Sequence, residues 1–174
     1  ENTKIWPYCL SAAGLSLQLY DKLFGAKTHW VYDQWIEFAK KHFTTRNASG
    51  DITGFAFYYD PLEQFAYCPP PGLSGYGMLA PLFYLYPQAP EFGLQLYEAG
   101  LRDLRWNKQT GSLLQAFDDP RWLTMVLMLA REVGDDTTER QLKLIAEQEF
   151  GPDFFAEDAD RFAWRFGVDE PHPR

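Results

Sequence analysis

The chain has 174 residues, a formal net charge of −8 and a pI near 4.8. This length fits one domain or part of a larger one. The acidic balance, with no stripe of Lys and Arg, argues against a nucleic-acid partner. The longest apolar run, residues 123–130, is far shorter than the roughly 20 residues that cross a bilayer. We therefore expect a soluble protein with no transmembrane segment and no disulfide framework, since it has only two cysteines.

The chain begins at Glu1 rather than at a methionine, and no signal-like segment precedes Cys9. We therefore expect a fragment from which the true N-terminus has been removed. Aromatic residues make up 17% of the chain, which is more than a simple core needs. This surplus indicates a cavity with aromatic walls.

The first expected helix covers residues 10–24, because Pro7 is typical of a helix start and Gly25 of a helix end. Apolar residues occur on nearly every side of it, which is typical of a helix buried on all sides. Cys9 would lie at its N-terminus, where the partial positive charge of the helix favours a thiolate. Cys9 is thus a candidate for chemistry, and the alternative is a small, buried and inert residue.

A second helix is expected after Thr28, a suitable N-cap, because apolar residues recur every three to four positions from Val31 to Phe43. The two helices would form an αα-hairpin with one inner and one outer member. A turn-forming cluster follows at residues 46–51. Alternating side chains then predict a β-hairpin with strands near residues 55–59 and 64–68.

Three prolines at residues 69–71 follow this hairpin and hold the chain extended and stiff. Such a segment would fix the residues that it presents, Tyr67 and Cys68. The alternative is a plain stiff connector to the next helix.

The rest of the chain predicts two more helical hairpins and a tail. Ser74 would cap a helix that Pro81 kinks, Pro120 fits the first position of another, and Thr137 or Thr138 would cap the last. The expected helices cover residues 75–86, 91–106, 121–133 and 139–150, and residues 154–166 form a short strand or an irregular arm.

Three successive αα-hairpins predict an all-α fold of the α/α toroid type, an (α/α)6 barrel, with a β-hairpin insertion. A closed ring of this kind needs about twelve helices, of which the chain supplies about half. Residues 1–174 would then be the C-terminal part of a single barrel domain. The sequence contains no nucleotide, zinc-protease, redox or α/β-hydrolase motif. We therefore expect neither a cofactor nor a metal site.

The order of these features resembles the linalool dehydratase/isomerase family. Members of this family have a motif Cys-Glu-Pro-x-Asn-x-Phe-x-x-Cys, which leads into a helix that ends near Leu-Tyr-Asp-x-Leu-x-Gly. The corresponding segments here read Glu1-Asn2-Thr3-Lys4-Ile5-Trp6-Pro7-Tyr8-Cys9 and Leu19-Tyr20-Asp21-Lys22-Leu23-Phe24-Gly25. Residues 55–61 and 129–135 also look like that family, whereas Asn2-Thr3 replaces Pro-x and residues 68–71 have no counterpart.

The resemblance implies a barrel that packs as a symmetric homo-oligomer. It also implies cofactor-free removal of water from an allylic tertiary terpenoid alcohol, or isomerisation of that alcohol. Cys9 matches the second of two active-site cysteines, and the first would precede Glu1. The N-terminal half of the same protein would supply an aspartate and tyrosines. The departures from the motif suggest a larger or different terpenoid as the substrate.

Loss of water requires a proton for the leaving hydroxyl and a base for a proton of the neighbouring carbon. Cys9 is the catalytic candidate for this acid-base chemistry. An allylic cation would be stabilised by aromatic faces. The candidates for a substrate-binding wall, each of which could equally belong to the core, are Trp6, Tyr8, Tyr67, Cys68 and Tyr76.

Two other functions fit the pattern. The first is a sugar-processing α/α barrel, an epimerase or a glycoside hydrolase, which needs paired carboxylates or histidines in the cavity. The acidic clusters of this chain lie at expected helix ends, where capping explains them. The second is a non-catalytic binding scaffold. A thiol and tyrosines in the cavity would favour the terpenoid enzyme, paired carboxylates the sugar enzyme, and a filled centre the scaffold.

Overall fold

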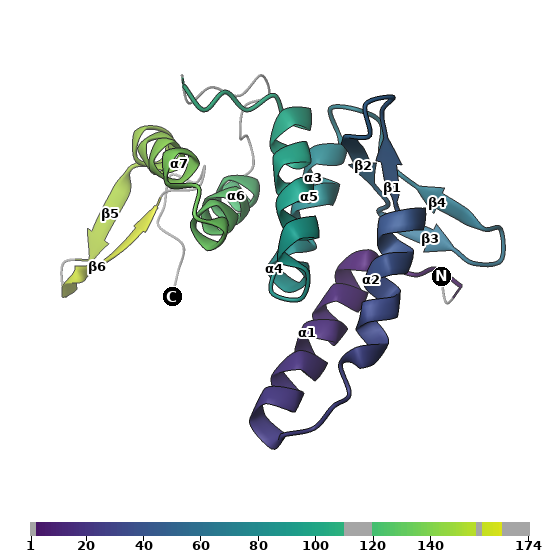
Figure 1. Ribbon diagram of the computed structural model, residues 1–174. Coiled ribbons are helices and arrows are strands. Elements are labelled where there is room, and N and C mark those ends of the chain that lie inside the picture. Colours follow the sequence, from purple (N-terminus) through teal and green to yellow (C-terminus); the bar gives the residue numbers. More distant parts are fainter. Residues whose placement is uncertain (1–2, 110–119, 156–157, 165–174) are drawn as a thin grey trace. The chain divides into compact units, whose positions relative to one another are not determined.

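The structure is a computed structural model that describes residues 3–109, 120–155 and 158–164 (Figure 1). The chain divides into two compact units, Glu1–Trp106 and Asn107–Arg174. The first contains α1 (Pro7–Phe24), α2 (Trp30–His42), β1 (Thr44–Arg46), β2 (Ile52–Phe55), β3 (Tyr58–Asp60), β4 (Phe65–Tyr67), α3 (Ser74–Leu79), α4 (Leu82–Leu85) and α5 (Pro90–Asp103). The second contains α6 (Pro120–Val133), α7 (Asp136–Phe150), β5 (Pro152–Phe155) and β6 (Asp158–Trp164).

Helix α1 ends where the sequence predicts and begins three residues earlier than the predicted start at residue 10. Pro7 is its first residue, and Gly25 ends it in the left-handed conformation, with φ of 66°. The prediction that the helix is buried on all sides is wrong. Ser11 and Gly14 are buried on the side that packs against α4, whereas Leu23 and Phe24 near its end are 76% and 70% exposed.

The all-α fold class is also wrong, because the described residues contain three two-stranded antiparallel sheets, β1-β2, β3-β4 and β5-β6. The predicted hairpin exists, but its first strand is divided. Phe55 ends β2 and pairs with Thr44 of β1, while Tyr58 begins β3 and pairs with Tyr67. Strand β1 was missed because its three residues merge into the turn at Asn47.

The predicted α/α toroid is wrong as well, because the helices do not pack as inner and outer pairs. A toroid needs inner helices that are covered all round, and α1 leaves one side exposed. Its main partner within its unit is α4, whereas α3 packs on α5 and α6 packs on α7. The predicted helix over residues 75–86 is two short helices, because Pro81 lies between them and starts α4.

The helix caps differ from those expected as well. The backbone and hydroxyl of Thr28 donate hydrogen bonds to the Asp21 carboxylate, at 2.8 and 2.7 Å, so Thr28 does not cap α2. Helix α7 is capped by Asp135, which accepts from the backbone of Thr138 at 3.2 Å. The prediction that Thr137 or Thr138 is the cap is therefore wrong. The expected arm in the tail is the hairpin of β5 and β6.

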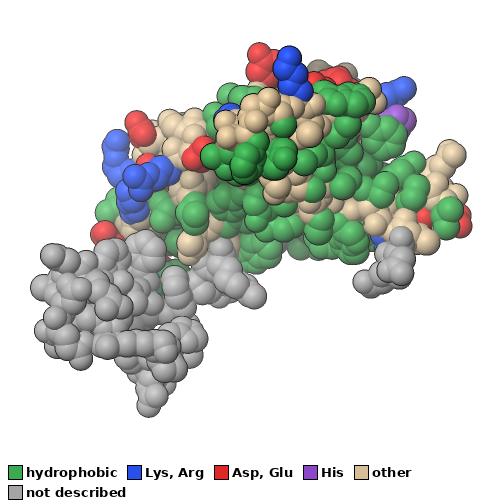
Figure 2. Space-filling model, turned by 90° about the horizontal axis from the view of Figure 1, so that it is seen from below, with side chains coloured by type: hydrophobic (Ala, Val, Ile, Leu, Met, Phe, Trp, Pro, Cys, Tyr) green, Lys and Arg blue, Asp and Glu red, His purple; other side chains and the backbone are tan. Residues whose placement is uncertain are grey.

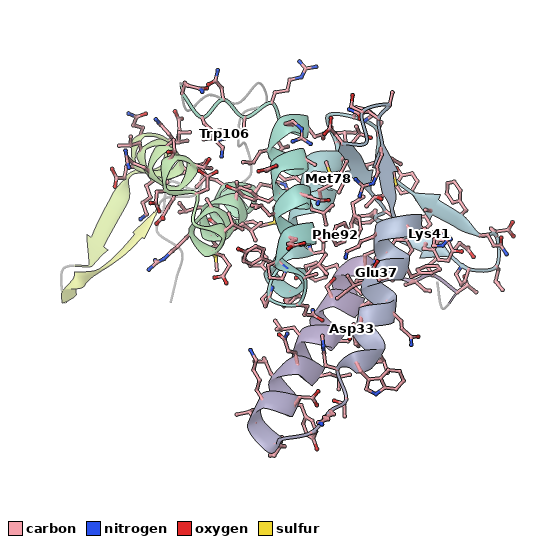
Figure 3. The ribbon with its side chains drawn as sticks, in the orientation of Figure 1. Asp33, Glu37, Lys41, Met78, Phe92 and Trp106 are labelled. Atoms are coloured by element: carbon pink, nitrogen blue, oxygen red, sulfur yellow. The ribbon has the colours of Figure 1, made fainter. Side chains whose placement is uncertain are left out.

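The core of the first unit lies between α3, α4, α5 and β2, and its fully buried side chains are large and apolar. They include Phe43, Phe55, Met78, Leu79, Leu82, Leu85, Leu96 and Tyr97. Figure 3 shows Met78 on α3 and Phe92 on α5. No helix among the described residues is long and apolar enough to cross a membrane.

The close contact between α3 and α5 depends on glycine. A Cβ on Gly75 would lie 2.6 Å from the Leu104 side chain and 2.8 Å from the Gly100 carbonyl. Gly77, on the same helix, has more room, because its Cβ would approach the Phe55 carbonyl only to 3.9 Å.

Replacement of Gly75 by Ala should lower the free energy of unfolding by about 1–3 kcal/mol, because the added methyl overpacks the contact. Gly77→Ala is the matched control and should be neutral or stabilising by up to about 1 kcal/mol, because Ala is the better helix former. Urea unfolding of the three proteins measures the difference. Equal midpoints for the two variants would contradict the close contact.

Candidate functional site

Cys9 lies in the first turn of α1, and its side chain is exposed. Residues Ala13 and Ser16 follow it at helical spacing and are exposed as well. We call these three residues the open face of α1. The face carries no charged side chain, so Cys9 stands at one end of an uncharged, largely apolar strip.

The phenol of Tyr8 lies against Tyr84 of α4. The two hydroxyl oxygens are 3.3 Å apart, and the rings meet edge to face with centroids 5.2 Å apart. The hydrogen bond to Tyr84, burial, and the nearby Tyr84 and Cys9 raise the pKa of Tyr8 above its usual value of 10.0. Tyr8 is therefore a neutral phenol at neutral pH. Tyr84 is a site residue that sequence reasoning missed, because no local pattern pairs it with Tyr8.

Gln88 fixes this arrangement. Its amide nitrogen donates to the backbone carbonyls of Ser11 on α1 and Tyr84 on α4, at 2.8 and 2.5 Å. Its amide oxygen lies 2.9 Å from Nε2 of His29. One side chain thus joins α1, α4 and the start of α2.

Trp6, which directly precedes α1, and Tyr67 belong to one aromatic cluster, in which Tyr58 lies between them. The Trp6 ring packs edge-on against Phe57 at 5.4 Å and tilted against Tyr58 at 5.6 Å, measured between centroids. Tyr58 in turn stacks on Tyr67 at 5.2 Å, and Nζ of Lys4 lies 4.7 Å from the Tyr58 centroid. The structure therefore places Trp6 and Tyr67 in one cluster with Phe57 and Tyr58, which were not among the predicted site residues. Tyr8 follows Trp6 by two residues and contacts Tyr84 instead.

Backbone hydrogen bonds fix the segment before α1 on this cluster. Ile5 and Tyr59 exchange N–H to carbonyl bonds of 2.7 and 2.8 Å, as neighbouring antiparallel strands do. These two hydrogen bonds fix the backbone next to Trp6 and thereby the point at which α1 begins. The alternating pattern of residues 55–59 predicts a strand here, but it does not identify Ile5 as the neighbour.

Cys68 and Tyr76 lie in other surroundings. Sγ of Cys68 is 3.9 Å from the Phe43 carbonyl, at the end of α2, and burial raises the pKa of the thiol. Tyr76 is half-buried on α3 beside Gly75, where that helix meets α5. The Cys68 thiol thus lies against the end of α2 rather than against α1.

A separate groove of about 580 Å³ lies between α2 and the start of α5. Asp33, Glu37 and Lys40 line it from α2, and Glu91 and Phe92 line it from α5 (Figure 3). The Lys40 ammonium lies 2.6 Å from the Glu37 carboxylate and 5.8 Å from the Phe92 centroid. Cys9 does not line this groove.

Within the part of the chain that the structure describes, no three His, Cys, Asp or Glu side chains are grouped to hold a metal ion. No protein-family model matches the chain, and no curated protein matches it. The resemblance to the linalool dehydratase/isomerase family therefore stays a prediction that rests on the residues quoted above.

The two thiols should differ in reactivity. Cys9 is exposed, whereas Cys68 is half-buried and its pKa is raised, so less of it is thiolate at neutral pH. With a maleimide reagent at pH 7, we expect the Cys68→Ser variant, which retains Cys9, to be modified at least about 10-fold faster than Cys9→Ser. Mass spectrometry follows the reaction. Equal rates would contradict the described positions of the two thiols.

Proposed function

We propose that this chain carries the cysteine part of the active site of a cofactor-free lyase or isomerase. Its substrate would be a terpenoid alcohol, an allylic tertiary alcohol that loses water or is isomerised. The observation that carries the proposal is the exposed thiol of Cys9 in the first turn of α1, one residue after Tyr8 of the Tyr8–Tyr84 phenol pair and three residues after Trp6 of the aromatic cluster. The motif around Cys9 supports the same assignment by resemblance.

The groups around Cys9 suit a hydrophobic alcohol. Ala13 and Ser16 are small and leave space beside the thiol for a hydrocarbon chain. Apolar side chains are also abundant on the face seen in Figure 2, toward which α1 runs from Cys9 to its end. Trp6 offers an aromatic face close to the first turn of α1, and such faces attract an allylic cation. The site so described is open to solvent.

An open site needs cover before it can hold a developing cation, because water would capture that cation. We infer that the N-terminal half of the same protein covers the open face of α1 and contributes the second cysteine. We also infer that the protein is a homo-oligomer. Both proposals rest on the family resemblance, and the uncharged surface of the open face supports the first.

In the proposed reaction, Cys9 exchanges a proton with a carbon atom of the substrate. In dehydration the C–O bond breaks, the hydroxyl leaves as water with an added proton, and a C–H proton on the next carbon goes to a base. Cys9 is the group that we assign to this C–H proton. In isomerisation, water returns at the other end of the allylic system.

The sugar-processing alternative has one observation in its favour, the carboxylates of Asp33, Glu37 and Glu91 in the groove between α2 and α5. Glu37 is held in an ion pair with Lys40 at 2.6 Å, so its carboxylate is not free to face a substrate. The terpenoid reaction therefore has the better-equipped site.

The full-length protein should convert linalool, or the longer alcohol nerolidol, to a diene or a rearranged alcohol that gas chromatography detects. Cys9→Ala should reduce this rate by at least about 100-fold, because it removes an acid-base group. Cys68→Ser is the matched control and should leave the rate within about threefold, since the half-buried Cys68 thiol contacts the Phe43 carbonyl at the end of α2 and not the first turn of α1.

Unchanged turnover in Cys9→Ala would remove Cys9 from the mechanism. Absence of turnover in the unmodified protein with both alcohols would overturn the proposed function. Hydrolysis of a glycoside that is lost in Glu91→Gln, but not in Cys9→Ala, would instead assign the groove between α2 and α5 as the active site.

A further inference from the structure

We propose that Tyr8 is the proton donor to the leaving hydroxyl of the substrate, and that Tyr84 is the positioning residue that holds the Tyr8 ring directed at that hydroxyl. This inference rests on the proposed function and adds the missing acid to it. Neither the motif around Cys9 nor the pattern of α4 indicates that these two phenols meet.

The geometry restrains the Tyr8 ring on two sides. Pro7 and the first turn of α1 fix its backbone, and the Tyr84 ring packs edge to face against it. About half of Tyr8 remains exposed, 46%, so its phenol is open to a ligand while it contacts Tyr84. A donor that acts on a bound alcohol needs both properties, a fixed direction and access.

Tyr84 is held by the contact between α4 and α1. Gln88 donates to the Tyr84 carbonyl and to the Ser11 carbonyl, so the two helices keep one spacing at the level of the phenols. Gly14 allows Gln88 to approach α1 this closely, because a Cβ at that position would clash with the Gln88 amide oxygen and the Tyr32 ring. The Tyr8–Tyr84 pair is therefore held by the packing of α1 on α4 and not by the two side chains alone.

The groups around the Tyr8 phenol keep it protonated at neutral pH. The titratable groups near the Tyr8 phenol are Cys9 on its own helix and Tyr84 on α4, and both raise its pKa. The sequence of α4, Leu82–Leu85, contains no charged residue. No described cation faces Tyr8 from α4 to favour a phenolate, so Tyr8 holds its proton at neutral pH.

The proton transfers balance without another reactant. The Tyr8 O–H bond breaks, and its proton joins the substrate hydroxyl, which leaves as water with both electrons of the C–O bond. Cys9, acting as a thiolate, takes the C–H proton; afterwards the exposed S–H gives a proton to water, and the Tyr8 phenolate takes one from water. The Tyr84 hydroxyl can act as donor or acceptor at 3.3 Å, so it can accept from the phenol and donate to the phenolate.

The test uses the full-length protein with tyrosine labelled at ¹³Cζ, and it compares Tyr8→Phe, Tyr84→Phe and the control Tyr20→Phe. Tyr20 is an exposed phenol further along the same helix. The first measurement is the pH midpoint of the Tyr8 ¹³Cζ signal, assigned by its loss in Tyr8→Phe. The second is the pH profile of kcat/KM with linalool.

Tyr8→Phe should lower kcat/KM by at least about 100-fold, the range of a general acid. Activity should fall as the pH rises through the pKa of Tyr8, because the phenol then loses its proton. Tyr84→Phe removes the contact that raises this pKa, so both the ¹³Cζ midpoint and the alkaline limb of the profile should move to lower pH together. Tyr20→Phe should change neither.

Gln88→Met is a second variant of nearly the same size that brings no charge to the Tyr8 phenol. It loses the donor to the Ser11 and Tyr84 carbonyls. It should move the midpoint and the alkaline limb in the same direction as Tyr84→Phe. Circular dichroism of each variant confirms that the helices are retained.

The outcomes separate the two proposals. If the unmodified protein converts linalool and Tyr8→Phe retains the rate of Tyr20→Phe, Tyr8 is not the donor, while the proposed function stands. An unmoved midpoint or alkaline limb in Tyr84→Phe overturns the positioning role. If the unmodified protein converts no terpenoid alcohol, the proposed function fails and the role of Tyr8 as an acid fails with it.

Discussion

The two hydrogen bonds by which Gln88 joins α4 to α1 determine the rest of the candidate site. Its amide donates to one carbonyl on each helix, and these backbone contacts set the distance between them. Gly14 is the feature of α1 that permits the approach, since any side chain there would displace Gln88. The Tyr8–Tyr84 pair follows from that spacing, and the same contact leaves the opposite side of α1, with Cys9, exposed.

A second restraint acts on the other end of the same segment. The backbone pairing of Ile5 with Tyr59 holds the chain just before Pro7, and Trp6 packs on the ring of Tyr58. The first turn of α1 is therefore held from both directions, by a strand that precedes it and by a helix that packs beside it. A thiol on such a turn has a fixed position although it is exposed, and a fixed position is what acid-base catalysis demands.

The sequence predicted the features that depend on neighbouring residues. Pro7 and Gly25 mark the ends of α1, and alternation near Tyr58 marks a hairpin. Burial failed as a prediction because apolar residues all round a helix do not reveal what packs on each side, and Leu23 is largely exposed. The meeting of Tyr8 with Tyr84 and Gln88 depends on chain positions far apart, which no local pattern encodes. The place of Cys9 in the first turn of α1 could be predicted because its signal, a cysteine just after Pro7, is local.

The most direct test of the central claim, that Cys9 is the reacting thiol of a site for allylic terpenoids, is covalent labelling with geranyl bromide. A thiolate displaces bromide from this reagent, and peptide mass spectrometry locates the adduct. We predict that the adduct forms on Cys9 and that linalool slows its formation, whereas linalool does not slow labelling by iodoacetamide in denaturant. An adduct that forms mainly on Cys68, or a Cys9 rate that linalool leaves unchanged, would contradict the account.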